Sequence, residues 1–302
     1  MRLLTVCLLL LGLAAPAAAA PLTVEDSGGT HTFQAPPERV VALSWSLTEQ
    51  LLNLDVTPVG VADPEGYRHW VVRPALPEGV ADLGLRQEPN LERIAELAPD
   101  AILISDDQRA FLEPLARIAP VLHFETFSAD HDNLAASRET YQRLATLLDR
   151  EGLAAERLAE RDARLQELRE RVRAHFDGDP PKVTVVRFLD EARLAVYGGN
   201  AMSTFALEAL GLESGLPQPD SKWGFAMLTL RDLARLTEGV LLYIEPVPKG
   251  AEQFDKPLWK ALPVVRAGNV EALPPTWSYG GVFSVVYFAE AITDALLRLD
   301  PQ

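Results

Sequence analysis

Side chains that could carry out catalysis are few and widely separated in this sequence. The five histidines never pair at the spacing of metal ligands or of a nucleophile and its base; they are His31, His69, His123, His131 and His175. Ser278 lies in the segment LPPTWSYGG and is the best candidate nucleophile, but no histidine is close to it in sequence. The phosphate-loop, HExxH and GxSxG motifs are absent. We therefore expect a protein that is not an enzyme, with an exported hydrolase as an alternative.

The stretch Asp130-His131-Asp132 has the residue types of a metal site but not its geometry. Adjacent side chains point in different directions, and the stretch directly precedes a predicted helix. We expect it to cap that helix at its N-terminus. The sequence therefore predicts neither a metal site nor a cofactor of the protein's own.

Large aromatic side chains in turn-rich segments are the most informative feature that remains. Trp70, Trp223, Trp277 and Tyr279 all lie in turn-rich segments, which are PEGYRHWVVRP, DSKWGFA and LPPTWSYGG. Loops seldom bury aromatics without a reason, and aromatics at loop ends commonly line ligand clefts. Trp259 lies among apolar residues and is expected in the core, whereas Trp45 fits a core or a cleft wall equally well. Together these residues predict a cleft with aromatic walls.

The N-terminal 20 residues have the pattern of a cleavable secretory signal peptide. A basic start at Arg2 is followed by an apolar run over 3–13 and a small-residue tail over 14–20. The run is shorter than the about 20 residues that a membrane-spanning helix needs. The only cysteine, Cys7, follows Val6 and so is poorly placed for lipid attachment. We expect an exported, soluble protein that has no cysteine and no disulfide after export.

The charge of the chain excludes two classes of partner. The formal net charge is −15, and the loss of Arg2 with the signal peptide makes it −16 (−15 minus +1). Such a surface repels nucleic acid and anionic lipid. Neither is expected as a partner.

The elements that must position the aromatic residues are short apolar strands alternating with helices. Strands are predicted over 39–43, 58–62, 101–105 and 121–125, and again over 182–189, 194–198 and 240–245. Strands that alternate with helices indicate parallel βα units and an α/β protein. We expect an N-terminal lobe over 21–150 and a C-terminal lobe over 178–302.

A segment of different composition separates the two halves. From Leu153 to His175 the chain contains no proline or glycine, and Leu158, Leu165, Leu168 and Val172 form a narrow apolar stripe. A coiled coil is possible but three heptads barely suffice. A single stiff helix, within a connecting segment over 151–177, fits the pattern better.

Several segments resemble a known family in order along nearly the whole chain. They are RVVALSWSLTEQLLNLDVTPVGVAD, YRHWV, DLGLRQEPNLERIAELAPD, LARIAP, PLWKALPVVRAGNV and WSYGG. They are similar to the ferric-siderophore-binding proteins of bacterial periplasmic import systems, most of all to the ferrichrome-type, ferric-hydroxamate group. The resemblance implies two Rossmann-like βα lobes joined by one long helix, which is the helical-backbone periplasmic binding protein fold. It also implies a monomer that delivers an iron(III)–siderophore complex to an inner-membrane ABC permease.

The resemblance also assigns roles to individual residues. Arg86 in GLRQEPN matches the arginine that bonds the iron-bound hydroxamate oxygens, and Trp70, Trp223, Trp277 and Tyr279 match aromatic pocket positions. The sequence departs from the family pattern at two ligand positions, where Gln108 replaces a tyrosine and Ser278 replaces an aromatic residue. The exact siderophore is therefore open. The alternatives are the same fold carrying a carboxylate siderophore, haem or cobalamin.

Permease docking is the last role that the resemblance implies. In the family, each lobe presents an acidic residue that pairs with permease arginines. Glu92 in NLERI matches the first of these residues. In the second lobe the acidic position falls on Arg231, with Asp232 beside it, so we expect Asp232 to contribute less than Glu92.

Overall fold

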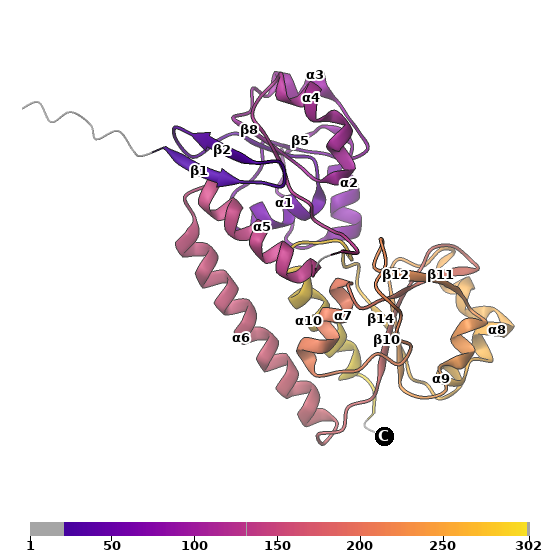
Figure 1. Ribbon diagram of the computed structural model, residues 1–302. Coiled ribbons are helices and arrows are strands. Elements are labelled where there is room, and N and C mark those ends of the chain that lie inside the picture. The colour runs from indigo at the N-terminus through magenta and orange to yellow at the C-terminus, as the bar shows by residue number, and fades with distance from the viewer. Residues whose placement is uncertain (1–20, 131, 301–302) are drawn as a thin grey trace, which may run out of the picture.

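Two lobes and one long helix make up the molecule. The computed structural model describes residues 21–130 and 132–300, and the predicted signal peptide lies outside these residues. Figure 1 shows the N-terminal lobe above the C-terminal lobe, with helix α6 (Glu151–His175) running along one side of both. Within the described residues, no helix combines the length and the apolar character needed to cross a membrane.

A five-stranded, fully parallel sheet forms the centre of the N-terminal lobe, in the order β5-β4-β3-β8-β9. Its strands are β3 (Val40–Ala42), β4 (Gly60–Val61), β5 (Ala81–Asp82), β8 (Ala101–Ile104) and β9 (Val121–His123). Val40 and Val41 of one strand belong to two different core clusters, so both faces of this sheet are covered. The four strands predicted in this half are confirmed. The two-residue edge strand β5 was not predicted, because it is too short to form an apolar run.

The sheet of the C-terminal lobe is mixed, which corrects the expectation of parallel units in this half. Its order is β12-β11-β10-β13-β14. The strands are β10 (Val183–Phe188), β11 (Arg193–Tyr197), β12 (Phe225–Thr229), β13 (Val240–Ile244) and β14 (Val270–Leu273). Strands β10, β13 and β14 are parallel, whereas β10, β11 and β12 are antiparallel neighbours. Only residues 189–192 separate β10 from β11, and so short a connection cannot hold the crossover helix that a parallel pair requires.

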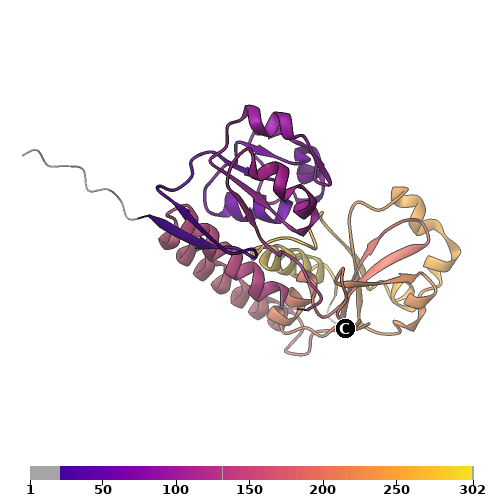
Figure 2. The same ribbon diagram turned by 45° about the horizontal axis from the view of Figure 1, so that its top comes forward.

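Helix α6 has 25 residues and confirms the predicted long helix. At about 1.5 Å per residue it spans about 37 Å. Leu158, Leu168 and Val172 of the predicted stripe are buried, and Leu165 packs partly buried against the same core. The helix contacts α5 (Asn133–Leu147) of the first lobe and both α7 (Met202–Leu210) and α10 (Ser284–Leu296) of the second. Figure 2, in which the top of the molecule is tilted toward the viewer, shows the hairpin of β1 (Leu22–Glu25) and β2 (Thr30–Phe33) beside these helices.

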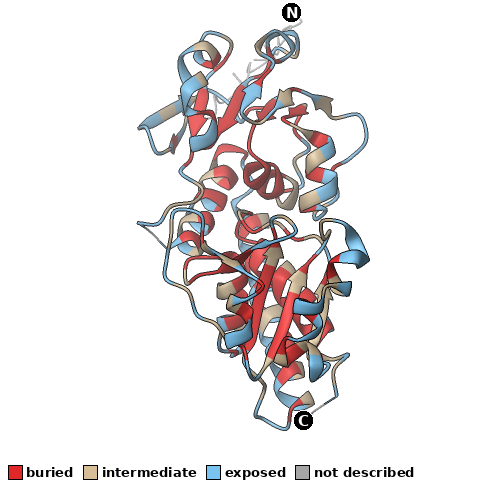
Figure 3. Cartoon of the chain, turned by 90° about the vertical axis from the view of Figure 1, so that its right-hand side faces the viewer, coloured by how far each residue is buried: buried red, intermediate tan, exposed pale blue. Residues whose placement is uncertain are grey.

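A second connection between the lobes runs through helix α1 (Trp45–Asn53). Glu49 of α1 is fully buried, and its Oε2 accepts hydrogen bonds from the backbone N–H of Gly281 at 3.1 Å and the hydroxyl of Ser284 at 2.7 Å. Leu47 of α1 and Phe288 of α10 belong to one core cluster. Figure 3 shows buried segments continuing from one lobe into the other. The two lobes therefore share one hydrophobic core, which passes through α1 and α10.

Short elements complete both lobes. In the first lobe they are α2 (Pro64–Gly66), η1 (Tyr67–Val71), β6 (Gly84–Leu85), β7 (Glu88–Pro89), α3 (Leu91–Glu96), η2 (Asp106–Phe111) and α4 (Leu112–Ala116). In the second they are η3 (Asp232–Arg235), η4 (Gly250–Asp255), α8 (Pro257–Lys260) and α9 (Pro263–Arg266).

Candidate functional site

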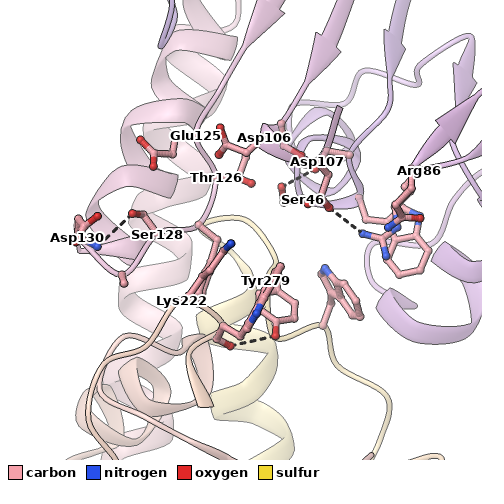
Figure 4. Close-up of a pocket in the computed structure, with 18 residues that line it drawn as sticks. Ser46, Arg86, Asp106, Asp107, Glu125, Thr126, Ser128, Asp130, Lys222 and Tyr279 are labelled. Carbon is pink, nitrogen blue, oxygen red and sulfur yellow. Dashed lines mark hydrogen bonds and ion pairs between the residues drawn. The ribbon is translucent and has the colours of Figure 1, made fainter. Parts of the chain in front are cut away.

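A cavity of about 700 Å³ lies between the lobes and holds the candidate site. From the first lobe it receives the segments that follow the carboxyl ends of β3, β8 and β9, together with the β6–β7 turn. Ligands of open α/β sheets commonly bind at this edge. The second lobe adds Lys222, Trp223, Trp277 and Tyr279. Figure 4 shows Arg86 at one end of this cavity, with Glu125 and Asp130 toward the other.

Arg86 occupies the turn of the β6–β7 hairpin and is fixed by aromatic stacking. Its guanidinium lies over Trp45, 3.9 Å from the ring centroid, and 5.5 Å from the ring centroid of Trp277. An oxygen of Asp107 is 3.7 Å from its Nη1. Burial lowers the pKa of Arg86, and Asp107 and Asp63 oppose that change. The arginine stays charged at neutral pH because a guanidinium in a protein is not deprotonated there. The guanidinium is therefore partly desolvated, and it faces the cavity.

Aromatic rings form a continuous chain from Arg86 to the outer rim of the cavity. The ring centroids of Trp45 and Trp277 are 4.8 Å apart, those of Trp277 and Tyr279 5.4 Å, and those of Tyr279 and Trp223 6.4 Å. Phe127 of the first lobe meets Tyr279 edge-on at 5.0 Å. Trp223 is 54% exposed, so it does not fill a core. The prediction that Trp223, Trp277 and Tyr279 share a cleft agrees with this arrangement.

Trp70 and Ser278 line a smaller compartment of about 330 Å³. It shares Trp45, Arg86, Trp277 and Tyr279 with the main cavity, so the two compartments adjoin at these residues. Its other lining residues are Arg187, Phe188, Leu189, Ala195, Tyr197 and Phe225. The hydroxyl of Ser278 donates a hydrogen bond to the Tyr197 hydroxyl and is buried. Tyr197 therefore contacts Ser278, the position at which the family pattern has an aromatic residue and this sequence has a serine.

Gln108 does not line either compartment, in contrast to its predicted place in the ligand site. It is fully buried in η2. Its Oε1 accepts from the backbone N–H and the hydroxyl of Ser105, and its Nε2 donates to the carbonyl oxygen of Arg86 at 2.9 Å. An amide can satisfy these inward bonds in a way that a longer phenol side chain cannot. Gln108 thus holds the turn that carries Arg86.

The family of this chain follows from a match over most of its length. The model of the periplasmic binding proteins matches residues 40–276, which cover most of both lobes, the long helix and most of the residues around the cavity. The chain belongs to the periplasmic binding protein family. Proteins of this family bind substrates rather than transform them.

Three similar proteins are informative about the ligands that this fold carries. The iron(3+)-hydroxamate-binding protein FhuD of Escherichia coli K12 is 32% identical to this chain in sequence. The match covers 88% of this chain and 89% of the FhuD chain. The crystal structure of FhuD from Vibrio cholerae with Fe3+–Desferal is 40% identical, with a TM-score of 0.85 over 87% of this chain and 99% of that chain. The Fe(3+) dicitrate-binding periplasmic protein FecB of Escherichia coli K12 is 30% identical over 87% of this chain and 86% of its own.

The structure adds lining residues that were not singled out in the sequence. Ser44 and Ser46 flank Trp45 at the end of β3, and Asp106, Asp107, Glu125 and Asp130 follow β8 and β9. Their position at strand ends is a signal that the sequence contains. Arg187 and Tyr197 give only a weak signal, because each lies near the end of a mostly apolar strand that also contains another polar residue.

Ser278 and Asp132, which the sequence offered as parts of a catalytic site and of a metal site, have other partners in the structure. The partner of Ser278 is Tyr197 rather than a histidine. No group of three or more acidic, histidine or cysteine side chains is placed to hold a metal ion within residues 21–130 and 132–300. Asp132 accepts from the backbone N–H groups of Leu134 and Ala135, which confirms it as the N-cap of α5; His131 lies outside the described residues.

The two predicted docking residues differ in their surroundings. Glu92 is exposed in the first turn of α3. Asp232 instead accepts hydrogen bonds from the backbone N–H and the hydroxyl of Thr229, at 2.8 Å and 2.7 Å, and these bonds lower its pKa. The carboxylate of Asp232 is therefore engaged within its own lobe, whereas that of Glu92 is available.

Proposed function

We propose that this protein captures a ferric hydroxamate siderophore in the periplasm and delivers it to an ABC permease for iron uptake. One observation carries the proposal: the desolvated guanidinium of Arg86, stacked on Trp45, opens onto an aromatic cleft in a chain similar to a protein solved with Fe3+–Desferal. The cleft residues act in binding, and Gln108 acts indirectly by holding the turn of Arg86.

The chemistry of the cleft suits such a cargo. A hydroxamate siderophore supplies the iron ligands itself, so the protein needs none. Its hydroxamate oxygens carry the negative charge, and its outer surface is largely apolar. Arg86 offers charge-assisted hydrogen bonds to the oxygens, and Trp223, Trp277 and Tyr279 offer apolar area. Because Arg86 is already partly desolvated, binding an anionic group costs it less than it would cost a fully hydrated arginine.

The charges and hydrogen bonds of the cleft argue against two alternative cargoes. A carboxylate chelate such as ferric dicitrate, the ligand named for FecB, would meet Asp106, Asp107, Glu125 and Asp130 in the main cavity. A ferric dicitrate complex keeps a net negative charge, whereas three hydroxamates only balance the charge of iron(III). The four carboxylates therefore disfavour the carboxylate chelate more than the hydroxamate chelate. Haem would need a histidine or tyrosinate ligand. Burial raises the pKa of Tyr279 well above its usual range, and its hydroxyl donates to the carbonyl oxygen of Trp223 at 3.0 Å, so it is held as a neutral phenol.

Export, organisation and delivery follow from the same proposal. Residues 1–20 act as a cleavable signal peptide, and the protein then works as a periplasmic monomer. The N-terminal lobe over 21–150, the connecting segment over 151–177 and the C-terminal lobe over 178–302 are its working parts. Glu92 on the first lobe, supported by Asp232 on the second, contacts the permease.

A ligand screen by tryptophan fluorescence tests the proposed function. Trp45, Trp223 and Trp277 line the cavity, so an iron chelate in the cleft should quench their emission. We expect saturable quenching by ferric Desferal with a Kd of about micromolar or tighter. Metal-free Desferal serves as the control for the iron complex. Tighter binding of ferric citrate, haem or cobalamin than of ferric Desferal would reject a hydroxamate carrier.

A further inference from the structure

Arg187 is a partly buried guanidinium in the side compartment, and it has an unusual set of neighbours. It is the penultimate residue of β10, the central strand of the C-terminal sheet, which pairs with β11 on one side and β13 on the other. Side chains alternate along a strand, so Arg187 shares a face with the buried residues Val183 and Val185. A strand paired on both sides holds its side chains more rigidly than a loop does. Arg187 is therefore a fixed cation at the edge of a core.

The contacts of Arg187 leave its charge without a counterion. Its Nη2 donates to the carbonyl oxygen of Thr276 at 2.7 Å, and its guanidinium lies 5.6 Å from the ring centroid of Trp70. Among residues 21–130 and 132–300, no carboxylate lies within ion-pair distance of Arg187. A guanidinium has five N–H donors, so one carbonyl leaves most of them available. A partly desolvated and unpaired charge is costly in an empty protein, and an anionic ligand would offset that cost.

The two compartments of the cleft also differ in charge. Arg86 and Arg187 line the side compartment, and the described residues around it include no carboxylate. The main cavity has Arg86 and Lys222 but also Asp106, Asp107, Glu125 and Asp130. The negatively charged part of a ligand is therefore attracted to the side where the two arginines are, near Trp277 and Tyr279, which border both compartments.

We propose that Arg187 is a second cationic contact for the iron-bound hydroxamate oxygens and that it reaches them from the C-terminal lobe while Arg86 reaches them from the N-terminal lobe. This inference rests on the proposed function. An iron complex of three hydroxamates carries six oxygens distributed around the metal, so one guanidinium meets only part of them. Two arginines from opposite walls fix the orientation of the chelate and bring both lobes into contact with it.

A purely structural role for Arg187 makes a different prediction. In that case the arginine only holds the loop of Trp277 through the carbonyl of Thr276. Arg187→Gln keeps an N–H donor for this carbonyl but removes the charge, and Arg187→Lys keeps the charge. If Arg187 contacts the ligand, Arg187→Gln should weaken ferric hydroxamate binding and Arg187→Lys should largely preserve it. If Arg187 only holds the loop of Trp277, the two variants should bind the ligand with the same affinity.

The test measures the Kd of ferric Desferal by tryptophan quenching for the wild type, R187Q, R187K and the matched control R266Q. Arg266 is exposed on α9 of the same lobe, outside both compartments. We expect R187Q to bind about tenfold to a hundredfold more weakly, the effect of losing a charge-assisted hydrogen bond. The Kd of R187K should lie within a fewfold of the wild-type Kd, and the Kd of R266Q should equal the wild-type Kd. Equal binding by R187Q and the wild type, or by R187Q and R187K, overturns the proposal.

A second measurement covers the case in which R187Q melts well below the wild type. A crystal structure of the wild-type protein with ferric Desferal then decides. A nitrogen of Arg187 within hydrogen-bond distance of a hydroxamate oxygen supports the proposal, and a guanidinium that stays on Thr276 alone overturns it. If the wild type fails to bind ferric Desferal, the proposed function itself is wrong, which is a separate result.

Discussion

The guanidinium of Arg86 lies 3.9 Å from the ring centroid of Trp45, whose Nε1 donates to the carbonyl oxygens of Ala62 and Asp63. The indole is thus fixed to the backbone after β4, and it fixes the arginine in turn. Gln108 holds the carbonyl of Arg86 from the other side. The cation of the cleft is therefore preorganised before a ligand arrives, which lowers the entropic cost of binding.

Replacing Arg86 with alanine should weaken ferric hydroxamate binding without unfolding the protein. We expect a loss of about 1.5–3 kcal/mol, roughly tenfold to a hundredfold in Kd, because a charge-assisted hydrogen bond is lost. Titration by quenching measures the loss, and thermal melting checks the fold. Arg117→Ala, an exposed change in the same lobe, is the control. Normal binding together with a much lower Tm would make Arg86 a structural residue instead.

The buried carboxyl of Glu49 should make stability depend on pH. Burial raises its pKa to about 7, and the hydrogen bonds from Ser284 and Gly281 oppose this only in part. Because the folded pKa exceeds the unfolded value of 4.5, the folded state binds the proton more tightly. The free energy of unfolding should therefore fall as pH rises from about 5 to about 8, by up to about 3 kcal/mol.

Glu49→Gln isolates this contribution, since it imitates the protonated carboxyl. The difference in Tm between E49Q and the wild type should shift in favour of E49Q as pH rises through 7. Glu92→Gln, which changes an exposed carboxyl, should leave the pH profile unchanged. A constant difference between E49Q and the wild type from pH 5 to pH 8 would show that Glu49 keeps an ordinary pKa.

Ligand binding should change the overall shape of the protein very little. Helix α6 packs against helices of both lobes, and the core continues through α1 and α10. A hinge in α6 would break backbone hydrogen bonds, and separation of α1 from α10 would expose Glu49 and its partners. Small-angle X-ray scattering should give nearly the same radius of gyration with and without ferric Desferal. A clear compaction on binding would show that the shared core is not rigid.

Permease docking should depend more on Glu92 than on Asp232. Glu92→Ala should abolish siderophore-dependent growth while ferric Desferal binding in vitro stays normal. Asp232→Ala should have a weaker effect, because its carboxylate is already bonded to Thr229. Normal transport by the double mutant would exclude this mode of docking.

The features that the sequence predicted well are those with a strong local signal. The stripe of Leu158, Leu168 and Val172 specifies α6, and the apolar runs around Val41 and Ile102 specify buried strands. The aromatic cleft was predictable because Trp223 and Tyr279 lie in segments that offer little apolar cover.

Features that depend on tertiary contacts were missed. The predicted strands over 182–189 and 194–198 already leave only residues 190–193 between them, so the antiparallel pairing of β10 and β11 could have been inferred from the sequence. The pairing of β11 with β12 could not, because residues 198–224 separate these two strands. Gln108 was assigned to the ligand site by position, but a side chain in a short helix can turn inward when Ser105 and Arg86 offer partners. Arg187 gives only a weak sequence signal, because the case for its proposed role depends on the side chains around it, which include no carboxylate among the described residues.

The position of iron in a complex tests the central claim most directly. Crystals grown with ferric Desferal and measured at the iron absorption edge locate the metal without reference to the protein. The proposed function predicts one anomalous peak between the lobes, in the cleft lined by Arg86, Trp277 and Tyr279, with hydroxamate oxygens at the guanidinium of Arg86. A cleft without an iron peak at saturating chelate would contradict it.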